Sequence, residues 1–122
     1  MEKDWWKKHL SEDGRVLDLR GTELTSLEGV DLPADLKELY LSGTDLTSLS
    51  GVKLPAELQA LYLDNTELSS LEGVKLPANL QVLCLSDTKL TSLPNSIKEL
   101  KELFMLNLSY MKLKELPDWL PE

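Results

Sequence analysis

Leucines recur with a fixed period along most of this chain, and that period constrains the fold more than any other feature. The first leucines of successive copies, 22 residues apart in the first four, are Leu17, Leu39, Leu61, Leu83 and, one residue later than the period predicts, Leu106. The first four copies follow the pattern Leu-x-Leu-x-x-Thr-x-Leu, and the fifth has Met111 in place of the threonine. Such a period is typical of a solenoid, in which each repeat packs on the next.

The two closely spaced leucines of each copy predict a short strand, because alternate side chains of a strand point to the same face. Stacked copies place these strands in a parallel sheet with the leucines inward. On the opposite side, three copies contain Gly-Val-x-Leu-Pro, which forbids a long helix, whereas apolar spacing predicts a helix over residues 95–102. The predicted fold is an α/β-type solenoid, a right-handed superhelix with a five-stranded parallel concave sheet and a mostly irregular or 3₁₀ convex side.

The two ends of the chain depart from the repeat. Residues 1–14 are predicted to form an N-terminal cap over the first leucine layer. Its apolar face has helical spacing and comprises Trp5, Trp6, His9 and Leu10. The repeat domain is predicted to span residues 15–122. At its end, Trp119 and Leu120 either cover the last layer or precede further repeats or another domain.

Residues 36–46 read Leu-Lys-Glu-Leu-Tyr-Leu-Ser-Gly-Thr-Asp-Leu and resemble the repeat of the leucine-rich-repeat family. The same pattern covers nearly everything after Gly14. The family usually has an asparagine, which hydrogen-bonds backbone groups of the turn, at the position held here by Thr22, Thr44, Thr66 and Thr88. A threonine hydroxyl can make part of these bonds, whereas Met111 in the last copy cannot.

The segments before three of the strands contain Leu-Pro-x-x-Leu and resemble a bacterial subtype of these repeats, found in secreted ubiquitin-ligase effectors of pathogens. In those proteins the repeats recognise the substrate, and a separate domain carries the catalytic cysteine. The resemblance therefore implies a bacterial origin. It does not imply ligase activity, because nothing in this sequence can be that second domain.

Neither an active site nor a cofactor site is predicted. His9 and Cys84 are the only histidine and the only cysteine. Three strand steps separate them by roughly 14 Å, which excludes a nucleophile–base pair, and together they cannot form a zinc site. An acidic turn column ends in lysines and predicts solvated surface rather than a calcium site; its members are Glu23, Asp45, Glu67, Lys89 and Lys112. We therefore predict a protein that is not an enzyme and needs no metal or cofactor.

The formal net charge of −8 argues against nucleic acid or an anionic membrane as the main partner, since both require a basic face. No apolar run is long enough to cross a membrane, and the first ten residues are too charged for a signal peptide. A single cysteine excludes an internal disulfide and favours a reducing compartment. These features predict a cytoplasmic location, with secretion as the alternative if a signal sequence has been removed.

The outward strand positions are the best candidates for a binding site. There, tyrosines adjoin small and apolar side chains with acidic residues around them, as in the core and rim of a protein interface. The predicted partner-binding residues are Asp18, Glu38, Tyr40, Ala60, Tyr62, Asp64, Val82, Cys84, Met105 and Asn107. Tyr40 and Tyr62 are the predicted anchors. Val82, Cys84 and Met105 form the predicted apolar floor, and the acidic rim favours a basic partner surface.

The predicted function is non-catalytic recognition of a protein or peptide on the concave face. Cross-strand stacking that merely stabilises the sheet would explain the same tyrosines. One alternative is the substrate-recognition arm of a larger bacterial effector or ubiquitin-ligase-like protein. Another is a structural or engineered scaffold without a natural ligand, because the middle copies are nearly identical and such repeats are designable. Self-association through an uncovered sheet edge is also consistent with the sequence.

Overall fold

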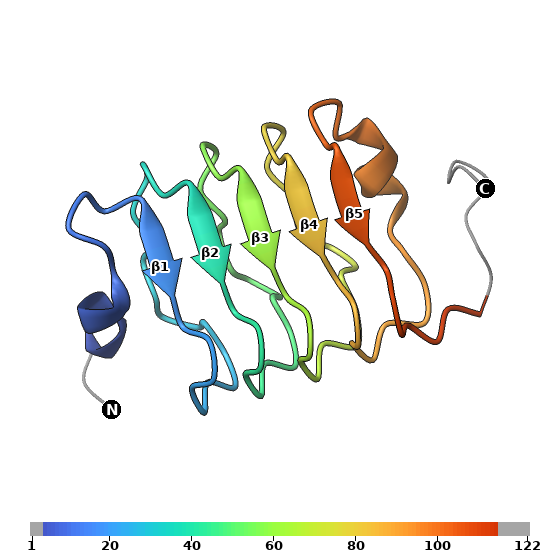
Figure 1. Ribbon diagram of the computed structural model, residues 1–122, viewed down its shortest axis with the longest axis horizontal. Coiled ribbons are helices and arrows are strands. Elements are labelled where there is room, and N and C mark those ends of the chain that lie inside the picture. The colour runs from blue at the N-terminus through green and yellow to red at the C-terminus, as the bar shows by residue number, and fades with distance from the viewer. Residues whose placement is uncertain (1–3, 115–122) are drawn as a thin grey trace.

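Five short strands lie side by side along one face of a coiled chain (Figure 1). The computed structural model describes residues 4–114. The strands are β1 (Val16–Asp18), β2 (Glu38–Tyr40), β3 (Ala60–Tyr62), β4 (Val82–Cys84) and β5 (Met105–Asn107). Two 3₁₀ helices complete the regular structure of the described residues, η1 (Trp5–His9) before the sheet and η2 (Asn95–Glu99) between β4 and β5. The predicted solenoid, its five-stranded parallel sheet and its irregular to 3₁₀ convex side are confirmed.

The strands pair in the order in which they occur in the chain, and the repeats stay in register. The first leucine of one copy lies opposite the first leucine of the next, as Leu39 lies opposite Leu61. This also holds from β4 to β5, where Leu83 lies opposite Leu106 although the fourth copy is one residue longer. The extra residue is therefore accommodated in the connection that contains η2, and the outward columns of the sheet remain aligned.

The inward leucines form a continuous core along the solenoid. The central strand leucines with 0% exposure are Leu17, Leu39, Leu61 and Leu83. Their counterpart in β5, Leu106, is only partly buried. The valines and leucines of the Gly-Val-x-Leu-Pro segments add to this core from the convex side: Leu54, Val74 and Leu76 are buried, and Val30, Leu32 and Val52 are partly buried. Because each repeat contacts mainly its neighbours, the middle copies are the best packed.

A threonine closes the turn after each of the first four strands. Its hydroxyl donates a hydrogen bond of 2.8–2.9 Å to the carbonyl of the leucine three residues earlier. This bears out the expectation that threonine takes over part of the role of the family's asparagine. The residue before it has a positive φ, which Gly21 and Gly43 adopt without strain. In the fifth copy that residue is Tyr110, with φ of 58°.

The helix predicted over residues 95–102 is shorter than expected and of 3₁₀ type. η2 ends at Glu99, and the N–H of Leu100 donates a hydrogen bond of 3.0 Å to the carbonyl of Ile97. Both Ile97 and Leu100 are buried. A 3₁₀ helix has three residues per turn, so one turn places two side chains of i, i+3 spacing on the same side. The core contacts are thus made without a longer helix.

The chain before β1 covers the outer edge of that strand. Trp6 is buried in the core cluster, and Leu10 packs against the same cluster. Leu10 also forms an antiparallel bridge with Leu17, and the N–H of Ser11 donates a hydrogen bond of 2.8 Å to the carbonyl of Val16. The protein's own backbone therefore occupies part of the β1 edge, and self-association through the sheet edges stays a prediction.

Gly14, at the predicted boundary between cap and repeats, connects this segment to β1 with a φ of 73°. At the other end, Trp119 and Leu120, expected to cover the last leucine layer, lie outside the described residues. Within residues 4–114, no helix combines the length and the apolar character needed to cross a membrane.

Candidate protein-binding face

The outward side chains of the five strands, together with the residue two positions after each strand, form one aligned surface, here called the concave face. Its three columns are Val16, Glu38, Ala60, Val82 and Met105; Asp18, Tyr40, Tyr62, Cys84 and Asn107; and Arg20, Ser42, Asp64, Ser86 and Ser109. Paired strands lie about 4.8 Å apart, so neighbours within a column are close enough to touch. The sheet thus brings together all ten residues that the sequence predicts to bind a partner.

Tyr40 and Tyr62 stack on each other at the centre of the concave face. Their residues are paired between β2 and β3, and their ring centroids lie 4.5 Å apart with an angle of 3° between the ring planes. An aromatic pair contributes about 0.5–1.5 kcal/mol beyond the area it buries. Both rings are only half-buried. The pair is therefore a rigid apolar platform that remains partly open to a partner.

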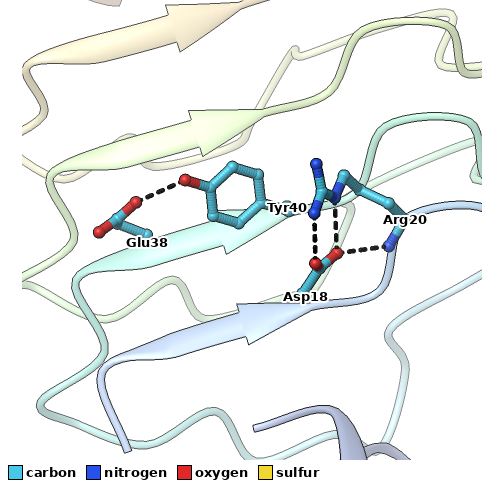
Figure 2. Close-up of polar contacts among 4 residues, drawn as sticks. All are labelled: Asp18, Arg20, Glu38 and Tyr40. Carbon is cyan, nitrogen blue, oxygen red and sulfur yellow. Dashed lines mark hydrogen bonds and ion pairs between the residues drawn. The ribbon is translucent and has the colours of Figure 1, made fainter. Parts of the chain in front are cut away.

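Arg20 closes the β1 end of this platform (Figure 2). Its Nε and Nη2 donate hydrogen bonds to the two carboxylate oxygens of Asp18, at 2.8 and 2.6 Å. The same guanidinium lies over the Tyr40 ring, with its Cζ 5.1 Å from the ring centroid. The hydrogen bonds from Arg20 hold the pKa of Asp18 below its usual range. The charges of Asp18 and Arg20 are therefore satisfied by each other, and the guanidinium lies next to the Tyr40 ring.

Glu38 binds the hydroxyl of Tyr40. The hydroxyl donates a hydrogen bond of 2.6 Å to Glu38 Oε1, so the ring lies toward Glu38 on its own strand (Figure 2). This hydrogen bond, with burial and the negative charge of Glu38, raises the pKa of Tyr40 well above its usual value. The phenol therefore stays neutral, and Glu38 forms no ion pair with a cationic side chain among residues 4–114.

Asp64 is the second acidic group beside the tyrosines. Its Oδ1 accepts a hydrogen bond of 2.7 Å from the hydroxyl of Ser42, the residue 22 positions earlier in the same column. In the part of the chain that the structure describes, Asp64 forms no ion pair. A carboxylate has two oxygens and about four acceptor positions. Asp64 therefore retains a charge and acceptor capacity at the edge of the platform.

Two residues predicted to be exposed on this face are buried instead. Ala60 and Cys84 each have only 7% exposure. The predicted inward and outward strand positions are still correct, because the neighbouring inward leucines Leu61 and Leu83 have 0% exposure. Ala60 and Cys84 have short side chains among longer ones, and closely spaced strands let the longer neighbours cover them. The prediction that Cys84 forms part of an accessible floor is therefore wrong.

We expect Cys84 to react slowly with an uncharged or anionic thiol reagent in the folded protein. Burial and the nearby charge of Asp64 raise the pKa of the thiol, and the thiolate is the reactive form. At neutral pH, labelling should be at least roughly tenfold slower than in denaturant. The rates are measured by absorbance with and without denaturant, and equal rates would contradict the burial of this side chain.

The model of the family described as leucine rich repeat matches residues 56–113, which include β3, β4 and β5. Residues 56–113 are leucine-rich repeats. The same unit continues in register through β1 and β2, which precede the matched segment. Domains of this leucine-rich-repeat fold are typically non-enzymatic and commonly mediate protein–protein interaction. No curated protein sequence matches the chain significantly.

Two solved structures have a similar leucine-rich-repeat fold. Internalin C2 from Listeria monocytogenes aligns over 83% of this chain with a TM-score of 0.74 and 22% sequence identity. The leucine-rich-repeat domain of a Shigella effector aligns over 92% with a TM-score of 0.62 and 28% identity. This chain spans 44% and 56% of those two chains, about half of their length. Both neighbours are bacterial, in agreement with the bacterial repeat subtype indicated by the Leu-Pro-x-x-Leu motifs.

The concave face of these repeats also has features that sequence reasoning missed or left open. Met105 and Asn107 are exposed as predicted. Phe104, directly before β5 and outside the three columns, is 73% exposed and was not predicted as a candidate. The contacts of Arg20 with Asp18 and Tyr40 were not predicted from the sequence. The sequence did contain a signal for these contacts, because Arg20 follows Asp18 by two residues and Asp18 aligns with Tyr40 of the next copy. Among residues 4–114, no group of histidine, cysteine and acidic side chains can hold a metal ion.

A groove of about 760 Å³ lies between η1 and the first leucine-rich repeat, outside the concave face. Trp5, Lys8 and His9 line one side, and Glu23 and Glu28 belong to the repeat side. Opposite charges therefore meet in one groove, and the lining favours no single ligand charge. The tyrosine platform differs from this groove, because Glu38 and Asp64 beside it form no ion pair among residues 4–114.

Proposed function

We propose that this leucine-rich-repeat chain is a non-catalytic recognition module that binds a protein or peptide on its concave face. The observation that carries the proposal is the half-buried stack of Tyr40 and Tyr62 beside Glu38 and Asp64. Tyrosine is enriched among residues that dominate binding energy, and rigid rings lose little conformational entropy on binding.

The charges around the stack favour a basic partner surface. Asp18 is neutralised by Arg20, whereas Glu38 and Asp64 have no cationic partner among the described residues. Two negative charges therefore remain beside the rings, on a chain whose formal net charge is −8. Complementary charge accelerates encounter and selects against acidic competitors. The free Cys84 thiol is compatible with a reducing compartment, and we propose a cytoplasmic location for the interaction.

The proposal predicts that Tyr62→Glu removes partner binding while the repeat fold persists. A carboxylate cannot replace the ring contact, and its added charge must be desolvated at the interface. Partner captured from a lysate of the source cell should fall by about tenfold or more, the loss expected for a central tyrosine. Captured proteins are quantified by mass spectrometry, and circular dichroism reports the fold of each variant.

The matched control is Ser69→Glu, which adds the same charge at an exposed position outside the concave face. Its capture should equal that of the original protein. If the stack serves only to stabilise the sheet, both variants capture the same proteins in equal amounts, and the proposed function is wrong.

A second candidate function is the substrate-recognition arm of a larger bacterial effector. The observation that favours it is the likeness to the leucine-rich-repeat domain of a Shigella effector, of which this chain spans 56%. The concave face would act in the same way in this case, but the bound protein would be a substrate of an attached domain. The length of the complete gene product distinguishes this candidate from a free-standing module.

A further inference from the structure

The last described strand, β5, lies at an edge of the sheet with no described strand beyond it (Figure 1). In the fourth copy, the C=O of Gln81 accepts backbone hydrogen bonds from the fifth copy, and the N–H groups of Leu85 and Asp87 donate to it, at 2.9–3.2 Å. The equivalent groups of the fifth copy are the C=O of Phe104 and the N–H groups of Leu108 and Tyr110. Among residues 4–114, no following strand meets these groups.

The fifth copy also carries an aromatic side chain at each end of this edge. Phe104 is 73% exposed and Tyr110 is 87% exposed. The earlier copies have charged or polar residues at the position of Phe104, namely Arg15, Lys37, Gln59 and Gln81. At the position of Tyr110 they have glycine or small polar residues, namely Gly21, Gly43, Asn65 and Asp87. The two aromatic residues therefore occur only in the copy that ends the described sheet.

Stacking of one more repeat does not explain these two side chains. Gly43, Asn65 and Asp87 are exposed although a further repeat follows each of them, so another repeat would leave Tyr110 exposed as well. Tyr110 also has a φ of 58°, a conformation that costs energy for a residue with a side chain. An exposed ring at a position suited to glycine is better explained by a contact outside the stack of repeats.

The sequence around β5 is complementary to itself when two copies run antiparallel about Asn107. Residues whose numbers are equally far from 107 then lie opposite each other, and each pair occurs twice, as two-fold symmetry requires. The opposed pairs are Phe104 with Tyr110, Leu106 with Leu108, and Glu102 with Lys112. Glu102 and Lys112 are exposed and form no ion pair among residues 4–114. Aromatic pairs and opposite charges across two strands both stabilise their pairing.

The backbone groups of this edge fit the same register. In an antiparallel pair, every second pair of opposite residues exchanges N–H and C=O hydrogen bonds. About Asn107, the N–H of Tyr110 in one copy meets the C=O of Phe104 in the other. These are two of the three groups that the earlier copies use to bind the next repeat. The N–H of Leu108, the third group, meets the C=O of Leu106.

We propose that β5 is a dimer interface, where a second copy of this chain pairs antiparallel about Asn107 and joins the two sheets. The β1 edge is partly paired with Leu10, so among the described strands β5 is the open one, and the assembly closes at two copies. Opposite residues of an antiparallel pair lie on the same face of the sheet. Both concave faces therefore point to the same side. This inference goes beyond the proposed function and does not depend on it.

Sedimentation equilibrium of the full chain tests the dimer. We expect a mass that rises with concentration from that of one chain to that of two. Phe104→Lys and Tyr110→Gly introduce residues that equivalent positions already hold, Lys37 and Gly43, so the fold should persist. Each variant should weaken dimerisation by roughly tenfold or more, as expected for an interface aromatic residue. Gln81→Lys, the same change one copy earlier, should leave dimerisation unchanged.

The mass of a single chain at every concentration would overturn the inference and leave the β5 edge to a different partner. Dimerisation that neither variant weakens would overturn it as well. Partner capture through Tyr62 is measured separately, so either result leaves the proposed function open to its own test.

A disulfide tests the register. Cys84 is replaced by alanine first, because it is paired with Asn107 in the sheet and could form a disulfide within the chain. Asn107→Cys then places two cysteines at the two-fold axis with Cα atoms about 4.5 Å apart, within disulfide range. Met105→Cys is the matched control, because its two copies lie four residues, roughly 14 Å, apart along the strands. With diamide as the oxidant, position 107 should crosslink and position 105 should not. Crosslinking at position 105 but not at 107 would contradict the proposed register.

Discussion

Leu61→Ala is expected to lower the free energy of unfolding by about 3 kcal/mol, within the roughly 2–5 kcal/mol usual for a buried leucine. Leu61 is at the centre of β3, has 0% exposure and is paired with Leu39 and Leu83 on either side. Truncation leaves a cavity between the repeats on either side. These repeats cannot close the cavity without disturbing the register of the strands. Urea unfolding followed by circular dichroism measures the loss.

The matched control is Leu106→Ala, which truncates the same column in β5. Leu106 is only partly buried, so the expected loss is about half as large, since less apolar area returns to water. Equal losses at the two positions would show that the middle repeats are not better packed than the last described one, contrary to this account of the solenoid core.

Thr66→Val is expected to cost about 1–2 kcal/mol although it hardly changes side-chain volume. The Thr66 hydroxyl donates a hydrogen bond of 2.8 Å to the carbonyl of Leu63, and its side chain is 2% exposed. Valine removes the donor and leaves the buried carbonyl of Leu63 without a partner. The cost of burying an unsatisfied carbonyl exceeds the small net stabilisation that an ordinary hydrogen bond contributes. Urea unfolding measures the difference.

Thr25→Val is the control, because Thr25 is exposed. Its effect should stay within about 0.5 kcal/mol. If Thr66→Val is equally mild, the threonine turn does not depend on its hydroxyl, and the explanation for the missing asparagine of the family is wrong.

The fold was predictable because one period determines both strand spacing and register. Once Leu39 and Leu61 occupy equivalent positions, every outward residue of one strand has its neighbour on the next, and the columns can be written from the sequence. The one-residue insertion in the fourth copy did not alter this. It falls in the connection that contains η2, where a longer segment is accommodated without moving β5.

The candidate site was predictable only as a set of columns. The burial of Cys84 depends on how far its longer neighbours extend, which the alternation of strand residues does not determine. The position of Arg20 over Tyr40 depends on a side-chain conformation that Asp18 fixes across the strand end. The 3₁₀ geometry of η2 depends on the space left by the core rather than on apolar spacing, which a longer α-helix satisfies equally well.

Site-specific photo-crosslinking tests the central claim, recognition through the concave face, most directly. A benzoylphenylalanine is introduced at position 105, whose methionine is 50% exposed on the concave face, and separately at position 69, which is exposed outside it. The account predicts that irradiation in lysate links one and the same protein to position 105 and not to position 69. A partner crosslinked at position 69 and absent at position 105 would contradict it.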